Sequence, residues 1–187
     1  MYITPAGCDV SQVVEAVTRA MQTDRVTELA AALAQTARRG ALDDPGLFPP
    51  PDAAGYARRS IWRDPQGRYV VLGMTWAPGQ GSPLHDHGGL FGAEIVVSGL
   101  MKERSFRLLD RDPDGRHLFA PERETLHGPG SIGTLVPPLE YHEFGNAGDD
   151  VAHTVHVYAG DLDRCTVFER EAGGWWRPSS IGLRRDG

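Results

Sequence analysis

The segment Gly-Gln-Gly-Ser-Pro-Leu-His-Asp-His (residues 79–87) places two histidines one residue apart on what reads as a β-strand. Side chains alternate along a strand with period two, so both imidazoles project to the same face. The pair follows a turn rich in glycine and proline and precedes the apolar run 91–100. A third histidine, His142, lies downstream within residues 139–146. Two imidazoles on one strand face supply part of a metal site, and His142 is the candidate for the third ligand.

Length, charge and cysteine content exclude several classes of protein. The 187 residues suffice for one domain with a buried core. The formal net charge of −6 argues against nucleic-acid binding, which depends on basic patches. No apolar run approaches the roughly 18 residues of a membrane span, and Met1–Pro5 lacks the basic and apolar leader of a secreted protein. Two cysteines, Cys8 and Cys165, make no disulfide framework. We therefore expect a cytoplasmic protein, either a monomer or a weak homo-oligomer.

Two short helices and a proline-rich connector are predicted before the first strand. Apolar residues recur at helical spacing across residues 11–22, with Asp9 or Ser11 as the candidate N-cap, and again from about residue 24 to 39. Residues 43–51 hold four prolines and a glycine, which indicates an extended connector. The helices carry no cluster of reactive groups, so we expect them to serve in packing.

Beyond residue 56 the pattern changes to short strands separated by turns at intervals of roughly ten residues. The expected strands are, in chain order, 56–62, 68–76, 92–98, 102–109, 117–119, 124–127, 131–136, 152–158 and 166–169. Many short strands without intervening helices indicate a β-sandwich or a barrel.

The spacing of glycine, histidine and proline resembles the two motifs of the cupin superfamily. The first motif is matched by Gly79, His85, His87 and Gly99, and the second by Pro138, His142 and Asn146. The resemblance implies an all-β cupin jelly roll (double-stranded β-helix) with two short N-terminal α-helices and a metal inside the barrel. We expect one domain over residues 1–187, divided into an N-terminal helical segment (1–40), a Pro-rich connector (41–55), the β-barrel (56–170) and a C-terminal tail (171–187).

The carboxylate that joins the histidines in many cupins has no counterpart at its usual place. The positions four and five residues after His87 hold Phe91 and Gly92, so a site of three histidines is expected. Glu94 lies two residues further on and is a candidate additional ligand if a β-bulge turns it inward.

A longer set of residues resembles the cysteine dioxygenase family of thiol dioxygenases, over roughly residues 56–168. The matching segments are Tyr56-Ala57-Arg58, His85-Asp86-His87, Tyr141-His142-Glu143, Asn146 and Thr154-x-His156-x-Tyr158. The resemblance implies that non-haem Fe(II) is held by His85, His87 and His142. Iron rests on the resemblance, because three imidazoles accept several divalent metals.

The resemblance also assigns roles around the metal. Arg58 would bind the substrate carboxylate, with Tyr56 beside it. The family's Ser-His-Tyr trio would be represented by Thr154, His156 and Tyr158, with His156 hydrogen-bonded to the phenol. The implied reaction adds both atoms of O₂ to the sulfur of a small carboxylate-bearing thiol. L-cysteine is the first candidate substrate, and 3-mercaptopropionate or another small thiol is the second.

Several positions depart from the family pattern. Gly92 stands where animal members carry a cysteine crosslinked to the tyrosine, so that crosslink cannot form here. Cys165 matches a cysteine near the mouth of the family's active site and is a further candidate site residue. Glu140 replaces a usual glycine. Arginine at position 58, where members acting on 3-mercaptopropionate tend to have glutamine, favours cysteine.

Simpler interpretations stay open beside these. Arg59 competes with Arg58 for the carboxylate, and His156 with Tyr158 would also fit a hydrogen-bonded core pair. The histidines expected at the surface are His117, His127 and His153. The alternative functions are a different metal-dependent cupin enzyme, which Glu94 as a fourth ligand would favour, and a non-catalytic cupin that binds a small molecule or a metal.

Overall fold

The computed structural model describes residues 10–22, 26–138 and 140–183. The expectations for Met1–Pro5, Cys8 and Asp9 lie outside the described residues. Helix α1 (Ser11–Met21) begins after Val10, so Ser11 lies inside the helix and is not its cap. Helix α2 (Val26–Arg38) follows, and a 3₁₀ turn (Pro45–Leu47) interrupts the proline-rich connector. None of the helices in the described part of the chain is long and apolar enough to cross a membrane.

The rest of the chain is β-structure, as predicted. The strands are β1 (Ala57–Arg63), β2 (Val70–Trp76), β3 (Leu84–His85), β4 (Gly92–Ser98), β5 (Met101–Arg111), β6 (His117–His127), β7 (Ile132–Leu135), β8 (Tyr141–Asn146), β9 (Ala152–Tyr158), β10 (Arg164–Arg170) and β11 (Trp175–Gly182). One sheet has the order β1-β2-β9-β4-β7. The second group closes on itself in the order β10-β11-β6-β5-β8-β3, because β3 pairs with β10. The pairings between these strands are antiparallel.

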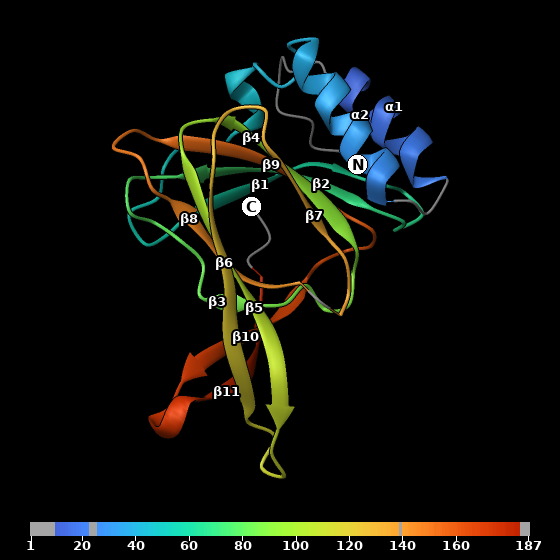
Figure 1. Ribbon diagram of the computed structural model, residues 1–187. Coiled ribbons are helices and arrows are strands. Elements are labelled where there is room, and N and C mark those ends of the chain that lie inside the picture. The colour runs from blue at the N-terminus through green and yellow to red at the C-terminus, as the bar shows by residue number, and fades with distance from the viewer. Residues whose placement is uncertain (1–9, 23–25, 139, 184–187) are drawn as a thin grey trace.

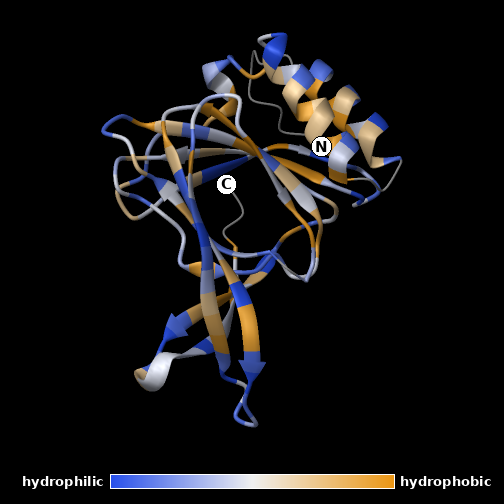
Figure 2. Cartoon of the chain, in the orientation of Figure 1, coloured by the Kyte–Doolittle hydropathy of each residue, from blue (hydrophilic) through white to orange (hydrophobic). Residues whose placement is uncertain are grey.

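The helices cover the outer face of the five-stranded sheet (Figure 1). Apolar side chains recur every three or four residues on each helix, and the fully buried ones include Val13 on α1 and Leu29 on α2. They join one core with alternate residues of the sheet, such as Val71 and Val155. Figure 2 shows the apolar stretches of the strands that lie beneath the helices. The helices therefore bury one face of the sheet and leave the residues of opposite parity to face the interior of the barrel.

Three segments differ from the sequence prediction. Residues 141–146, which are not among the expected strands, form β8. Residues 117–127 form one strand, β6, instead of two pieces, because Pro121 sits next to a register shift, where a missing N–H breaks no regular pairing. Residues expected as a C-terminal tail form β11, which pairs along β10 after a turn through Gly173 and Gly174, both at positive φ. The outer parts of β5, β6 and β11 extend away from the barrel as an arm (Figure 1).

The motif glycine after β4 is required by the turn. Gly99 has φ +83, and a Cβ there would lie 2.5 Å from the Cβ of Ala152. A side chain at this position would both strain the backbone and collide with β9. The glycine therefore lets β4 turn tightly into β5 while β4 and β9 stay paired.

Candidate metal centre and substrate pocket

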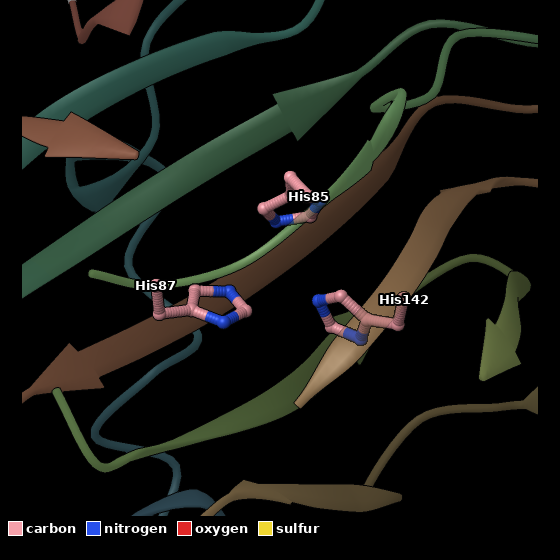
Figure 3. A group of neighbouring side chains, drawn as sticks. All are labelled: His85, His87 and His142. Atoms are coloured by element: carbon pink, nitrogen blue, oxygen red, sulfur yellow. The ribbon is translucent and has the colours of Figure 1, made fainter. Parts of the chain in front are cut away.

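Three histidines, from β3, from the segment just after it and from β8, converge between the two groups of strands (Figure 3). His85 on β3 is paired in register with His142 on β8, and His87 follows two residues after His85. One ligand atom from each ring lies within 4.8 Å of the others. The pattern of alternate residues and the antiparallel pairing of β3 with β8 thus bring these three imidazoles to one point.

The polar contacts of the three rings leave nitrogen atoms free for a metal. Nδ1 of His85 lies 3.0 Å from the carbonyl oxygen of Pro83, and Nδ1 of His142 lies 3.2 Å from Oε1 of Glu103. His87 is 1% exposed, and neither of its ring nitrogens has a hydrogen-bond partner among the described residues. A buried imidazole without any polar partner is costly. A divalent metal could be bound by Nε2 of His85, by Nε2 of His142 and by a ring nitrogen of His87, which would give His87 a polar partner. The residues present therefore fit such a metal.

Burial also keeps two of the rings neutral, as ligands must be. Burial and the nearby His142 lower the pKa of His85 to about 4. Burial, followed by the charges of His85 and His142, holds the pKa of His87 well below its usual range. For His142, burial lowers the pKa, but the hydrogen bond with Glu103 and the acidic neighbours outweigh it and raise the pKa overall. Because a ligand imidazole has to be neutral, metal binding by His142 weakens as the pH falls.

The low pKa of His85 predicts how stability of the metal-free protein depends on pH. In the unfolded chain His85 titrates near its ordinary pKa of 6.5, whereas in the folded protein it stays neutral down to about pH 4. Between these values the unfolded state binds more protons, so the free energy of unfolding falls as the pH is lowered. Chemical denaturation of chelator-treated protein at several pH values measures this. Replacing His85 with asparagine should make the free energy of unfolding depend less steeply on pH between pH 4 and 6.5. An unchanged slope would contradict the role given to His85.

Glu103 and His127 extend the site beyond the residues found in the sequence. Glu103 lies on β5 opposite β8, and its two carboxylate oxygens contact Nδ1 of His142 at 3.2 Å and Nε2 of His127 at 3.0 Å. The expectation of a surface position for His127 is wrong, since its side chain is 17% exposed and is held by Glu103. No spacing in the sequence signals this contact, because it depends on how β5 pairs with β6 and β8.

Removing the Glu103 carboxylate is expected to weaken metal binding. The carboxylate orients the His142 ring and fixes which nitrogen faces the metal, and loss of such a partner typically lowers metal affinity by about 10- to 100-fold. We expect that fall for Glu103→Ala in a competition titration against a coloured chelator. Glu124→Ala on β6 is the control, because this exposed carboxylate pairs with Arg104 outside the pocket. Equal affinities for Glu103→Ala and the wild type would contradict the role of Glu103.

The histidines lie in a pocket formed between the two groups of strands. The predicted site residues that line it are Tyr56, Arg58, His85, His87, Glu94, His142, His156, Tyr158 and Cys165. Arg58 and Arg59 point to opposite sides of β1. Arg58 lines the pocket and its Nη2 lies 3.4 Å from the carbonyl oxygen of Leu162, whereas Nη1 of Arg59 bonds to the carbonyl oxygen of Gly46. Arg58 is half-buried. Of the two arginines considered for the carboxylate, Arg58 is therefore the one on the pocket side of β1.

Tyr56, also on the pocket wall, stacks on Trp76 with ring centroids 4.4 Å apart. The structure also brings the trio on β9 together. Oγ1 of Thr154 lies 2.8 Å from Nε2 of His156, and Nδ1 of His156 lies 3.2 Å from the phenol oxygen of Tyr158. Burial, followed by the charge of the nearby Glu94, raises the pKa of Tyr158 strongly, so its hydroxyl stays protonated.

Glu94 lines the pocket, which is the inward orientation that the sequence analysis made conditional on a β-bulge. Its Oε2 lies 3.1 Å from Nδ1 of His156, its partner in the pairing of β4 with β9. That pairing contains a register shift between Val96 and Ser98. The carboxylate is thus engaged by His156, a contact that the sequence did not predict.

Cys165 lines the pocket, whereas Gly92 packs against β9 beside Tyr158. A Cβ at Gly92 would lie 2.5 Å from the carbonyl oxygen of Val157 and 3.1 Å from Cδ1 of Tyr158, so the structure leaves no room for a side chain there. Cys165 is buried and forms no disulfide within the part of the chain that the structure describes. Burial and the charge of Asp86 raise the pKa of this thiol to about 11, which keeps it protonated.

The chain is similar to a known family and to several solved structures. The model of the family described as cysteine dioxygenase type I matches residues 8–171. Among solved structures, a Thermus thermophilus protein is 20% identical, with a TM-score of 0.44, over 60% of this chain and 90% of that one. An uncharacterized double-stranded β-helix protein from Klebsiella pneumoniae is 20% identical, with a TM-score of 0.46, over 60% and 84%. A cupin 2 conserved barrel protein from Salinispora arenicola is 18% identical, with a TM-score of 0.42, over 57% and 76%.

Proposed function

Because the chain belongs to the cysteine dioxygenase type I family, we propose that it is a non-haem Fe(II) thiol dioxygenase. Family membership confirms the resemblance found in the sequence, and with the strand order it confirms the all-β cupin jelly roll with two N-terminal helices. The family consists of oxygenase-type enzymes that act on small molecules. The finer proposal is that both atoms of O₂ are added to the sulfur of L-cysteine, giving cysteine sulfinic acid.

The observation that carries the proposal is the unpartnered His87 beside two other buried imidazoles in a pocket that also holds Arg58. In this proposal His85, His87 and His142 hold the Fe(II). The bound metal would supply open positions for the thiol sulfur and for O₂, and would favour the thiolate form of the substrate. A binding barrel without catalysis would have no need of a buried phenol stacked on one of the metal-binding histidines.

Arg58 would bind the carboxylate of the substrate. Its planar guanidinium can donate two parallel hydrogen bonds to a carboxylate, a match that lysine cannot reproduce. Tyr56 on the same strand edge would shape this end of the pocket. Because 3-mercaptopropionate also carries a carboxylate, Arg58 supports a carboxylate-bearing thiol in general, and L-cysteine is the first candidate within that class.

Tyr158 would act next to the reacting sulfur. Its ring stacks on His87 with centroids 5.4 Å apart, and its hydroxyl lies within the hydrogen-bonded series of Thr154 and His156. A protonated phenol in a buried pocket can donate a hydrogen bond to negative charge that develops on oxygen or sulfur. Thr154 and His156 would hold the phenol in place.

Oxygen uptake by anaerobically Fe(II)-loaded protein tests the proposal. The thiols to compare are L-cysteine, cysteamine, 3-mercaptopropionate and mercaptosuccinate. We expect uptake with a carboxylate-bearing thiol, at about one O₂ per sulfinate formed, since both oxygen atoms end on the sulfur. Full iron occupancy without uptake for any thiol would contradict the proposal and would favour another metal-dependent cupin chemistry.

A further inference from the structure

Five buried polar side chains on β2, β4 and β9 form one hydrogen-bonded series behind and along the pocket wall. Nε1 of Trp76 lies 2.9 Å from Oγ1 of Thr154, which lies 2.8 Å from Nε2 of His156. Nδ1 of His156 lies 3.1 Å from Oε2 of Glu94 and 3.2 Å from the phenol oxygen of Tyr158. All five side chains belong to residues that are at most 5% exposed. These groups are therefore hydrogen-bonded to one another and not to bulk water.

The direction of each hydrogen bond follows from what each group can donate. The indole of Trp76 has a hydrogen to give and no lone pair to offer, so Thr154 accepts from it. A hydroxyl oxygen can accept two hydrogen bonds, so Thr154 can give its hydrogen to Nε2 of His156 or accept one from it, and Thr154 does not by itself fix the tautomer. Nδ1 faces the Glu94 carboxylate, which only accepts when ionised, so the ring hydrogen lies on Nδ1 and Nε2 accepts from Thr154. An imidazolium would also carry a hydrogen on Nδ1, so the direction at Glu94 is the same in both charge states.

Glu94 is suited to hold that hydrogen because an ionised carboxylate only accepts. Burial raises its pKa, but the hydrogen bond and the charge of His156 outweigh this and lower the pKa to about 2. The fold makes room for the carboxylate on β7, where a Cβ at Gly133 would lie 2.9 Å from Oε1 of Glu94. A larger residue at position 133 would push the carboxylate away from this place.

We propose that Glu94 is a positioning residue that holds a hydrogen on Nδ1 of His156 and thereby directs the hydroxyl hydrogen of Tyr158 into the pocket. With Nδ1 acting as donor, the Tyr158 oxygen accepts from it, and the phenol hydrogen has to point elsewhere. Without the carboxylate, Nδ1 is free to accept the phenol hydrogen, which then turns away from the pocket. The inference deepens the proposed function and rests on it for the identity of the group that the hydroxyl meets, a substrate sulfur or oxygen.

Nitrogen-15 NMR of the histidine rings tests the proposal without any turnover. The protein is measured as purified and after loading with Zn²⁺, which is diamagnetic, and the His156 signals are assigned by their loss in His156→Gln. We expect the hydrogen on Nδ1 in the wild type and on Nε2 in Glu94→Leu. Glu94→Gln, which keeps the side-chain volume if leucine prevents folding, should release the hydrogen from Nδ1 in part of the molecules. A hydrogen on Nε2 in the wild type, or one retained on Nδ1 in both folded variants, would overturn the proposal.

Two matched variants separate this effect from general perturbation. Thr154→Ser keeps the hydroxyl and should leave the His156 spectrum unchanged, whereas Thr154→Val removes the donor to Nε2 and should change it. Glu124→Gln removes one negative charge on the exposed face of β6 and should leave the spectrum as in the wild type. A change with Glu124→Gln as large as that with Glu94→Gln would overturn the assignment to Glu94.

Kinetics give a second readout once a thiol substrate is found. Because Glu94 acts on the phenol and not on substrate binding, Glu94→Gln should lower kcat by about 10- to 100-fold while KM changes by no more than about 2-fold. A raised KM with unchanged kcat would overturn the role given to Glu94. If the wild type shows the hydrogen on Nδ1 yet oxidises no thiol, the positioning by Glu94 stands and only the proposed function is contradicted.

Discussion

Replacing His142 with alanine is expected to abolish metal binding by the protein. Nδ1 of His142 is already engaged by Glu103, so its other nitrogen is the one left for a metal, opposite His85 and His87. Removal leaves two imidazoles, fewer than the three protein ligands that a stable open metal site uses. Since loss of a mere supporting contact costs about 10- to 100-fold in affinity, loss of a ligand should exceed 100-fold. Metal content after loading with Fe(II) and desalting measures the effect.

The matched control is His117→Ala on the arm. His117 is partly exposed and lies on β6, outside the three-histidine group, so its loss should leave metal content unchanged. Because His142 is 2% exposed, its truncation also creates a cavity. Thermal unfolding of the metal-free variant checks the fold, and His142→Gln provides a polar side chain of closer size. Full iron occupancy in a folded His142→Ala or His142→Gln would refute the assignment of this ligand.

The parts of the site that could be predicted from the sequence are those fixed by local periodicity. Alternation correctly predicted that His85 and His87 lie together, although β3 ends at His85 and His87 lies just beyond it. The turn after β4 needs a residue with positive φ, and Gly99 provides it. Thr154, His156 and Tyr158 are also alternate residues of one strand, β9, so their contacts follow from the strand alone. Strands β4 and β9 match their predicted bounds.

The contacts that could not be predicted cross from one strand to another. Glu103 meets His142 because β5 and β8 pair in one register, and Glu94 meets His156 because β4 and β9 do. A shift of one residue in either pairing would reverse the face presented, and nothing within a single strand specifies its partner's register. The strand β11 was missed for a related reason. It is stabilised by pairing with β10, and its own alternation is weak.

Replacing Arg58 with glutamine is expected to weaken binding of a carboxylate-bearing thiol selectively. Loss of one partner of a charged, hydrogen-bonded pair typically costs on the order of 2–5 kcal/mol. Arg58 is half-buried, so solvent screens its charge and the lower end applies, which corresponds to a roughly 30-fold increase in KM for L-cysteine. Cysteamine, which has no carboxylate, should show a change of no more than about 2-fold. Initial rates of oxygen uptake at varied thiol concentration measure both.

The adjacent Arg59 provides the matched control. Arg59→Gln removes the same charge one residue away, but the Arg59 guanidinium bonds to the carbonyl oxygen of Gly46 on the other side of β1. We expect KM for L-cysteine to stay within about 2-fold in Arg59→Gln, because the distance and screening leave little effect on a carboxylate in the pocket. An unchanged KM in Arg58→Gln would remove Arg58 from the substrate site. Equal increases in both variants would mean that net positive charge at this edge of the barrel, and not a direct contact, attracts the substrate.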